Sequence, residues 1–292
     1  MSRYLTTYVR KNVGANLERS IQRWSGDVVR SPSTPLNEIR DAALSDIFGG
    51  PQQQDPSPAA PALVQALLRH MMAETVSEGI INCLIVTNSK VANVQLTRIH
   101  EHLFAREHLP IRSTPLRDTH TRQTGDPTVA SVWRRQTFSA ATESCSPEMG
   151  HTIMNDHMPE LCSALHRGGE KNILPPIMNI LDGAYAFSRM LHGSRSSSGG
   201  TADAFYRAFV PEIGTALHAG QVELVKRCVK ADRGEEERVG ACVFPGLVKV
   251  SRGVPDPRGQ PVEDVQTVVR RAQIICQCAL SFGEPPAPGP MY

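Results

Sequence analysis

The chain has 292 residues, and 31 Lys and Arg nearly balance 29 Asp and Glu, which leaves a net charge of +2. Hydrophobic residues make up 40%, and Gly and Pro contribute 22 residues each. These figures exclude a collagen, a pure coiled coil, a disulfide scaffold, a wholly disordered chain and a strongly basic nucleic-acid binder. They allow one large domain or two ordinary ones, with many breaks between elements.

The first 26 residues predict an amphipathic helix in which Arg and Lys far outnumber the single acid, Glu18. Apolar residues recur every three or four positions, at Leu5, Val9, Val13, Leu17, Ile21 and Trp24. Such a stripe is typical of a first helix that packs on a core. An Arg-rich N-terminal helix is also the pattern of a mitochondrial transit peptide or of a helix on an anionic membrane surface. A mitochondrial location therefore stays open.

A second helix is expected from Pro35 to Phe48, with Thr34 or Ser33 as its cap and Gly49 as its end. Residues 1–48 then form an N-terminal helical segment that either docks on the rest of the chain or stays separate. Residues 49–61 are rich in Pro and Gln, which predicts a disordered linker.

Residues 62–282 are expected to form the main helical domain. An apolar segment over 62–86 predicts a buried helix bent near Gly79, and Ser89 and Ser146 are predicted helix caps. Pro159 should split the helix that contains it. Further helices are expected over 90–103, 127–138, 176–192, 202–210, 221–230 and 262–281.

Three segments of the chain depart from this helical pattern. Residues 107–125 are polar and basic, which suits either a functional loop or a tolerated insert. The stretch 238–250 resembles two short strands around a Pro-Gly turn, although a helix ending at Phe244 fits as well. Residues 283–292 are Pro-rich and predict a disordered tail. We therefore expect an all-α fold, an irregular bundle of about nine to eleven helices with at most one short β-hairpin.

No known catalytic, metal or cofactor motif occurs in the sequence, so we expect no catalytic residue, no metal and no cofactor. Glu148 and His151 match one Glu-x-x-His motif, but a di-iron bundle needs two such motifs and two more Glu. No specific nucleic-acid signal is present, and no apolar run approaches the roughly 20 residues that span a bilayer. Seven cysteines, an odd number, suit reduced thiols in the cytoplasm or nucleus.

If the protein is an enzyme, its site must be assembled from residues distant in sequence. The best candidate is a polar stripe in the 182–192 helix, because its four members lie near one helical face: Asp182, Tyr185, Arg189 and His192. A simpler interpretation is that the stripe borders the core.

Ser/Thr-Pro dipeptides point instead to regulation. They and their neighbours give candidate phosphorylation sites at Ser31, Ser33, Thr34, Ser57 and Thr114. The stretch from Arg30 to Pro35 resembles the phosphoserine peptides bound by 14-3-3 proteins, with Ser33 as the central serine. We therefore expect a non-enzymatic protein–protein interaction module, an adaptor or regulator.

Overall fold

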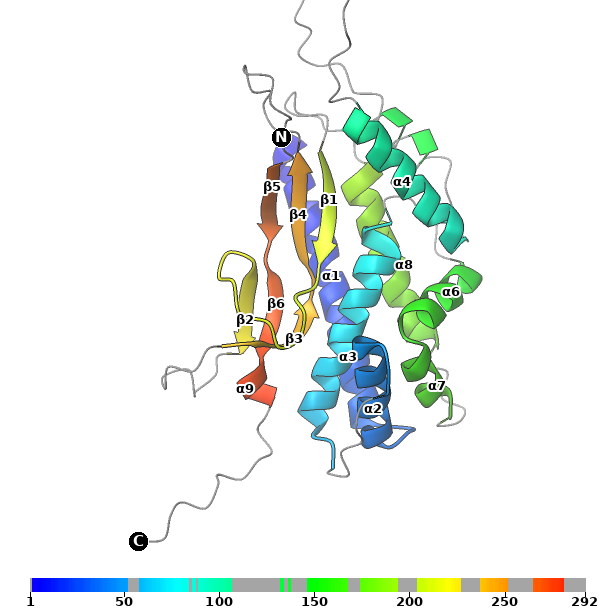
Figure 1. The fold of residues 1–292 in the computed structure, drawn as a ribbon, viewed down its shortest axis with the longest axis vertical. Helices are drawn as coiled ribbons and strands as arrows, with labels where there is room; N and C mark the ends of the chain where they lie inside the picture. The colour runs from blue at the N-terminus through cyan, green and yellow to red at the C-terminus, as the bar shows by residue number, and fades with distance from the viewer. Residues whose placement is uncertain are drawn as a thin grey trace, which may run out of the picture.

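In the computed structural model, helices pack beside and behind a twisted β-sheet (Figure 1). The structure describes residues 2–51, 58–83, 86–87, 89–106, 132–133, 136–137, 146–167, 174–193, 204–226, 237–251 and 265–280. Within these ranges the fold is mixed α/β, with eight α-helices, one π-helical turn and two three-stranded sheets. The all-α expectation is therefore wrong.

The helices occupy most of the first two thirds of the chain. Their bounds are α1 Ser2–Arg30, α2 Leu36–Phe48, α3 Pro61–Val76, η1 Ser77–Ile81, α4 Lys90–Arg106, α6 Pro147–His157, α7 Pro159–Arg167, α8 Leu174–Gly193 and α9 Gln277–Leu280. The π-helical turn η1 continues α3 and lies at the bend expected near Gly79. The helix predicted over 127–138 falls largely outside the described residues, as does the 107–125 segment.

Local signals place several helix ends correctly. Gly49 ends α2 with a positive φ of 69°, a conformation that glycine adopts without strain. The Ser146 hydroxyl accepts the Met149 N–H at 3.2 Å and caps α6, and α6 and α7 separate just before Pro159. Thr34 does not cap α2 as expected, because its hydroxyl donates instead to the Ala164 carbonyl of α7 at 2.8 Å.

The two sheets share two long antiparallel segments of the chain, each made of two consecutive strands. Strands β3 (Val239–Phe244) and β4 (Gly246–Ser251) follow each other, as do β5 (Val265–Arg270) and β6 (Ala272–Cys276). β4 pairs with β5 and β3 pairs with β6, both antiparallel. β1 (Ala204–Phe209) adds to β4 antiparallel, and β2 (Val222–Lys226) adds to β6 in parallel. The strand orders are therefore β1-β4-β5 and β2-β6-β3.

Three predicted helices in the C-terminal third are wrong, since 204–209, 222–226 and 265–276 are strands. These segments carry β-branched and aromatic residues that suit either state locally, and pairing with distant strands decides between them. The strand interpretation of 238–250 is confirmed, but the Pro-Gly turn is wrong. The chain passes Pro245 without reversing, and the pairing register shifts on both sides of it, as expected where proline interrupts a ladder.

Two glycines allow the sheet to close on its neighbours. A Cβ on Gly240 would lie 2.7 Å from the backbone N and Cα of Gln277, and one on Gly246 would lie 2.9 Å from the Ala272 backbone N. Both contacts involve backbone atoms that cannot rotate away. Any larger residue at these positions must therefore move a strand or the start of α9.

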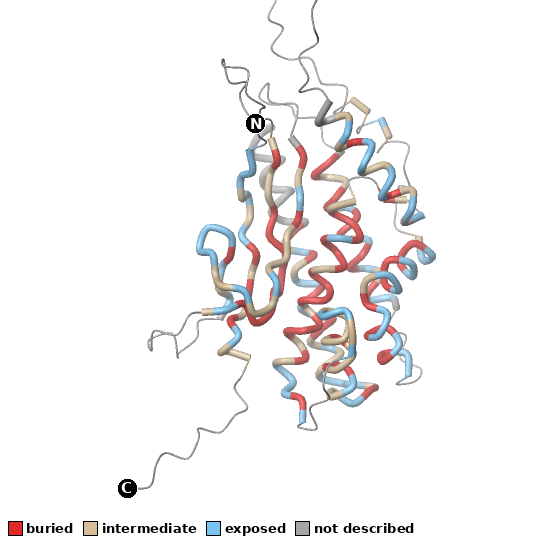
Figure 2. The backbone as a smooth tube through the Cα atoms, viewed as in Figure 1, coloured by how far each residue is buried: buried red, intermediate tan, exposed pale blue. Residues whose placement is uncertain are grey.

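The N-terminal helices dock on the rest of the chain. Leu17, Ile21 and Trp24 of α1 and Ile39 of α2 belong to one buried core shared with α3, α6, α7, α8 and the strands (Figure 2). Arg270 links α1 to the sheet, because it bonds Glu18 at 2.7 Å and its guanidinium lies 4.0 Å from the centre of the Phe244 ring. Of the two arrangements left open for residues 1–48, the structure has the docked one.

Four of the described cysteines are free: Cys83, Cys162, Cys242 and Cys276. Cys278 is disulfide-bonded. Its bond is not to Cys276, which is free although the two Sγ atoms lie 2.8 Å apart. The expectation of reduced thiols therefore holds for these four and fails at Cys278.

Candidate binding pocket

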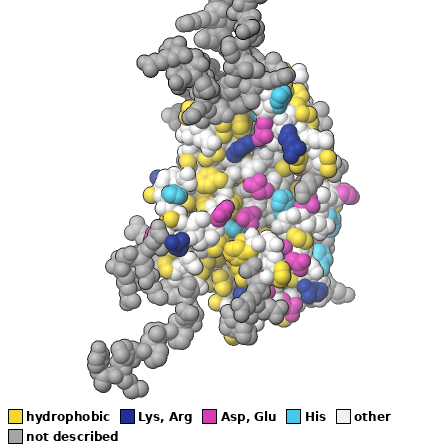
Figure 3. Space-filling view, viewed as in Figure 1, with side chains coloured by type: hydrophobic (Ala, Val, Ile, Leu, Met, Phe, Trp, Pro, Cys, Tyr) yellow, Lys and Arg dark blue, Asp and Glu magenta, His cyan; other side chains and the backbone are white. Residues whose placement is uncertain are grey.

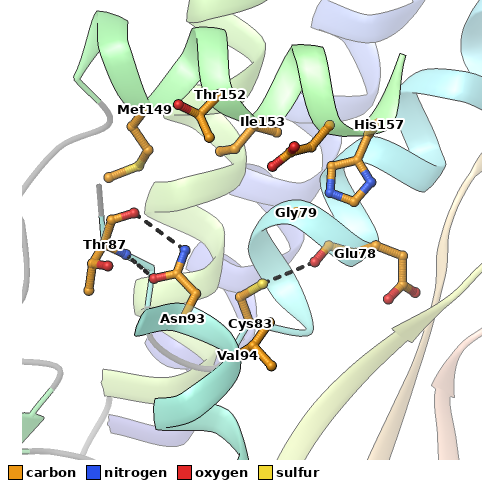
Figure 4. A pocket seen from close by; sticks show the side chains of 11 residues that line it. Glu78, Gly79, Cys83, Thr87, Asn93, Val94, Met149, Thr152, Ile153 and His157 are labelled. Carbon is orange, nitrogen blue, oxygen red and sulfur yellow. Dashed lines mark hydrogen bonds between the residues drawn. The ribbon is translucent and has the colours of Figure 1, made fainter. Parts of the chain in front are cut away.

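A pocket of about 180 Å³ opens between η1, α4 and α6 (Figure 4). Eleven described residues line it, from three separate stretches of the chain: Glu78, Gly79, Cys83, Thr87, Asn93, Val94, Met149, Thr152, Ile153, Asp156 and His157. One wall is the π-helical turn, an element that is rare and frequently found at functional sites. The pocket is therefore our candidate functional site.

Gly79 is the residue of the π-helical turn that lies closest against α6 in the pocket wall. A Cβ at this position would come within 2.9 Å of Ile153 Cγ2 and 3.2 Å of the His157 ring, both on α6. The absence of a side chain thus lets η1 approach α6 closely.

Asn82 holds this turn against the sheet. Its Oδ1 accepts the Ala208 N–H at 2.8 Å, and its Nδ2 donates to the Ala208 carbonyl at 3.1 Å. The amide therefore pairs with β1 much as another strand would. The same Nδ2 also donates to Glu78 Oε1 at 2.9 Å, which orients a carboxylate of the pocket. An asparagine that interrupts an apolar run in the sequence thus positions a wall of the site.

Asn93 performs a similar task on the α4 wall. Its Oδ1 accepts the Thr87 N–H at 2.6 Å, and its Nδ2 donates to the Thr87 carbonyl at 3.3 Å (Figure 4). The Ser89 hydroxyl accepts the Ala92 N–H at 3.3 Å, which confirms Ser89 as the cap of α4. Both hydrogen-bonding ends of the Asn93 amide are therefore engaged by backbone, although the residue is buried.

The pocket has an apolar floor and a polar rim. Met149, Ile153 and Gly79 are buried at the floor, whereas the exposed rim carries Val94, Thr152 and two carboxylates, Glu78 and Asp156. The Cys83 thiol donates to the Glu78 carbonyl at 3.1 Å. No Lys or Arg is among the described residues that line the pocket. Of the two carboxylates, that of Glu78 turns away from the cavity (Figure 4), toward Asn82.

The pocket does not display the geometry of a catalytic centre. Cys83 and His157 both line it, but the thiol hydrogen bond to a carbonyl oxygen does not activate a nucleophile as a bond to a general base would. No group of three or more potential metal ligands occurs among the residues that the structure describes. What the arrangement can do is accept an apolar group between η1, α4 and α6.

A direct contact between a histidine and a cysteine lies further back along α3, and it is sealed. His70 is 1% exposed, and its Nδ1 accepts the Cys242 N–H of β3 at 3.0 Å, while its Nε2 lies 3.4 Å from Glu74 Oε1. The Cys242 thiol donates to the Phe244 carbonyl at 3.2 Å, and burial raises the pKa of this thiol to about 12. We call these residues the sealed contact (His70, Glu74, Cys242); it joins helix and sheet.

The four candidates on α8 differ in exposure and in their contacts. Tyr185 is buried under Arg189, whose guanidinium carbon lies 5.9 Å from the ring centre. Asp182 is exposed, and His192 is buried with its Nε2 3.2 Å from the Ile81 carbonyl. Among the described residues, none of the four lines the pocket. Of the stripe, Tyr185 and His192 are therefore buried, whereas Asp182 is exposed.

The candidate phosphorylation sites differ in exposure. Ser31 is exposed and Ser33 half-buried in the short connection between α1 and α2, whereas Thr34 is buried and bonded to α7. Arg30 already pairs with Asp27 at 2.9 Å. Ser57 and Thr114 lie outside the described residues.

His100 is a buried histidine on α4. It contacts the rings of Trp133 and Phe205, so it packs within the structure.

Sequence reasoning missed the pocket residues as a group. Gly79 and Asn82 were noticeable as breaks in an apolar run, but nothing local connects them to 149–157.

Searches against family models, curated proteins and solved structures find no match for the chain. None of the described helices has the length and apolar character needed to cross a membrane.

Proposed function

We propose that the protein is a protein–protein interaction module that holds one apolar side chain of a partner in the pocket between η1, α4 and α6. The size of the pocket is the observation that carries this proposal. Small-molecule sites commonly measure roughly 300–1,000 Å³, whereas this pocket is about 180 Å³. A cavity of roughly 150 Å³ holds a benzene-sized group. The pocket therefore suits one anchoring side chain better than a whole substrate or cofactor.

The surroundings of the pocket support the same function. Val91 and Val94 are exposed aliphatic residues three positions apart on α4, so apolar surface continues beyond the mouth of the pocket. Interfaces commonly gain most of their free energy from a few buried anchors, with a polar rim that excludes water around them. An apolar floor with a polar rim fits this pattern.

The test compares two aspartate substitutions on one helix. Val94 lines the pocket and is 42% exposed, whereas Ile99 is 46% exposed on the same helix and does not line it. Tagged wild-type, Val94→Asp and Ile99→Asp chains would be purified from expressing cells, and co-purifying proteins quantified by mass spectrometry. We expect Val94→Asp to lose the specific partners and Ile99→Asp to retain them. Equal recovery by all three chains would contradict the proposal.

A steric variant provides an independent check. Thr152 is exposed at the rim on α6, so Thr152→Trp can reach into the pocket without replacing a core residue. It should remove the same partners as Val94→Asp, because both substitutions act on the pocket from different walls. Partners that survive Thr152→Trp bind elsewhere on the molecule.

We also propose regulation through phosphorylation of the α1–α2 connection, with a 14-3-3 protein as a partner of phosphorylated Ser33. The exposure of Ser31 and the partial exposure of Ser33 support access by a kinase. Because Thr34 is anchored to α7, recognition of an extended phosphopeptide would require this connection to open locally. Phosphorylated full-length chain should bind purified 14-3-3 protein, and Ser33→Ala should abolish this. Binding that persists in Ser33→Ala would overturn the assignment of Ser33.

A further inference from the structure

We propose that Cys276 and Cys278 form a thiol–disulfide exchange site where β6 meets α9, and that the free thiol of Cys276 displaces the present disulfide partner of Cys278. The site lies beside the sheet, away from the pocket between η1, α4 and α6 (Figure 1). The exchange is therefore independent of the proposed binding function.

The two sulfur atoms meet at the end of a strand. Cys276 is the last residue of β6 and is fully buried, whereas Cys278 lies in α9 and is partly exposed. Their Sγ atoms lie 2.8 Å apart. The N–H of Gln277, which lies between them in the chain, donates to the Arg238 carbonyl at 2.9 Å and restrains the backbone of this junction. A thiol held against a disulfide sulfur is placed for exchange, because the reaction begins when a thiolate attacks that sulfur.

The present partner of Cys278 follows from the remaining cysteines. Four of the other six are free, which leaves Cys145 and Cys228, both outside the described residues. Cys145 is two residues before α6, a span of at most about 7 Å, and Figure 1 shows α6 across the molecule from α9. Cys228 is two residues after β2, in which Lys226 pairs in register with Ile275 of β6. Cys228 is therefore the partner that the chain can bring to Cys278.

The step exchanges one disulfide for another. The Cys276 thiol gives its proton to water, and its thiolate sulfur forms a bond to Cys278 Sγ. The bond between Cys278 and Cys228 breaks, and its electron pair leaves with the Cys228 sulfur, which then takes up a proton. No net oxidation or reduction occurs, so the step needs no external oxidant or reductant.

The exchange releases β2 from a covalent tie to α9. Among the described strands, β2 pairs only with β6, and its register shifts between Leu224 and Lys226. Val225 is 49% exposed, and further hydrophobic side chains reach the surface over the sheet on the face seen in Figure 3. An edge strand with little cover belongs to the parts of a protein that open locally. We therefore expect the disulfide to determine how firmly β2 is held.

Peptide mapping can separate the two states, because trypsin places Cys228 in peptide 228–230 and both Cys276 and Cys278 in peptide 272–292. The full oxidised chain would be held at about pH 8, quenched in acid, labelled with N-ethylmaleimide at about pH 5 and digested without reductant. The original state gives the two peptides linked, with the label on Cys276. The exchanged state gives labelled peptide 228–230, and peptide 272–292 then contains the new bond.

We expect labelled Cys228 in the wild type at a level at least about tenfold above that in Cys276→Ser, because the attacking thiol is held in place. Cys83→Ser, which removes another free and partly exposed thiol, should match the wild type. Dilution of the wild type should leave the rate unchanged, since the reaction is intramolecular. Urea unfolding would confirm that both variants fold.

Several results would overturn the proposal. An absence of label on Cys228 in the wild type would exclude the exchange, and so would equal labelling in a folded Cys276→Ser chain. A linked peptide that contains Cys145 would overturn the assignment of the partner. Cys228→Ser removes the tie outright, so hydrogen exchange over 222–226 should be faster than in the oxidised wild type. Equal exchange rates would contradict the hold on β2.

Discussion

The continuous helix formed by α3 and η1 borders two contrasting environments, each with one histidine and one cysteine nearby. At the sealed contact, His70 and Cys242 are buried and hydrogen-bonded between helix and sheet. At the pocket, Cys83 and His157 are only partly buried beside open space. The same residue types therefore hold the fold together in one place and face a potential partner in the other. Burial and hydrogen-bond partners, rather than residue type, separate the two roles.

The largest expected effect concerns the glycines of the two regions. Gly240→Ala should lower the free energy of unfolding by about 2–3 kcal/mol, because the new Cβ would lie 2.7 Å from backbone atoms of Gln277. Gly79→Ala meets only side-chain atoms of Ile153 and His157, and alanine favours a helix by roughly 1 kcal/mol. Its net effect should therefore remain within about 1 kcal/mol. Urea unfolding of both variants checks this.

Gly220→Ala is the matched control, because no atom lies within 4 Å of the position its Cβ would take. A Gly240→Ala protein as stable as Gly220→Ala would show that β3 and α9 are less tightly packed than the structure indicates.

The sealed contact should be sensitive to removal of its imidazole. His70→Ala leaves the buried Cys242 N–H without its acceptor and opens a cavity, at a cost of about 2–3 kcal/mol. Glu74→Gln, at the partly exposed end of the contact, should change stability by less than about 0.5 kcal/mol. Equal effects of the two substitutions in chemical denaturation would contradict the larger role given to the buried bond between His70 and Cys242.

Alkaline pH should reveal the buried thiols. Burial raises the pKa of Cys242 and of Cys162 from 9.0 to about 12, so the folded state keeps both thiols neutral over a range in which the unfolded chain ionises them. Their contribution to stability is intact below about pH 9 and declines as the pH rises toward 12. Cys242→Ala should lose less stability than the wild type between pH 8 and pH 10.5, measured by urea unfolding.

Alkylation of the native protein gives a second measure of the same contrast. Iodoacetamide at neutral pH should modify Cys83 long before Cys242, because a thiolate is the reacting species and access is open only at the pocket. Peptide mapping after timed quenching would record the order. Reaction of Cys242 as fast as Cys83 would mean that the sealed contact opens readily.

The smallest expected effect is on stability at the pocket. Val94→Asp should change the free energy of unfolding by less than about 0.5 kcal/mol, since the residue is exposed at the rim. Its partner binding should nevertheless be lost. A large loss of stability would make Val94 part of the core and would remove its value as a test of binding.

Much of the helical part could be predicted from the sequence, because its signals are local. Gly49 and Ser146 act on backbone groups within one helical turn, and Pro159 interrupts a helix at its own position. The strands could not be separated from helices in this way. Val265–Arg270 and Ala204–Phe209 are apolar enough for either state, and they become strands by pairing with β4.

By itself the sequence determined a chain able to bury a large core, with defined helix ends and no local catalytic motif. Only the tertiary structure decided the site, because its walls come from stretches separated in sequence. Asn82 pairs with Ala208 across 126 residues, and α6 closes the pocket against η1. A hydrogen bond between such distant residues leaves no periodic pattern in the sequence. The approach of Gly79 to Ile153 at one apolar floor is therefore a property of the fold alone.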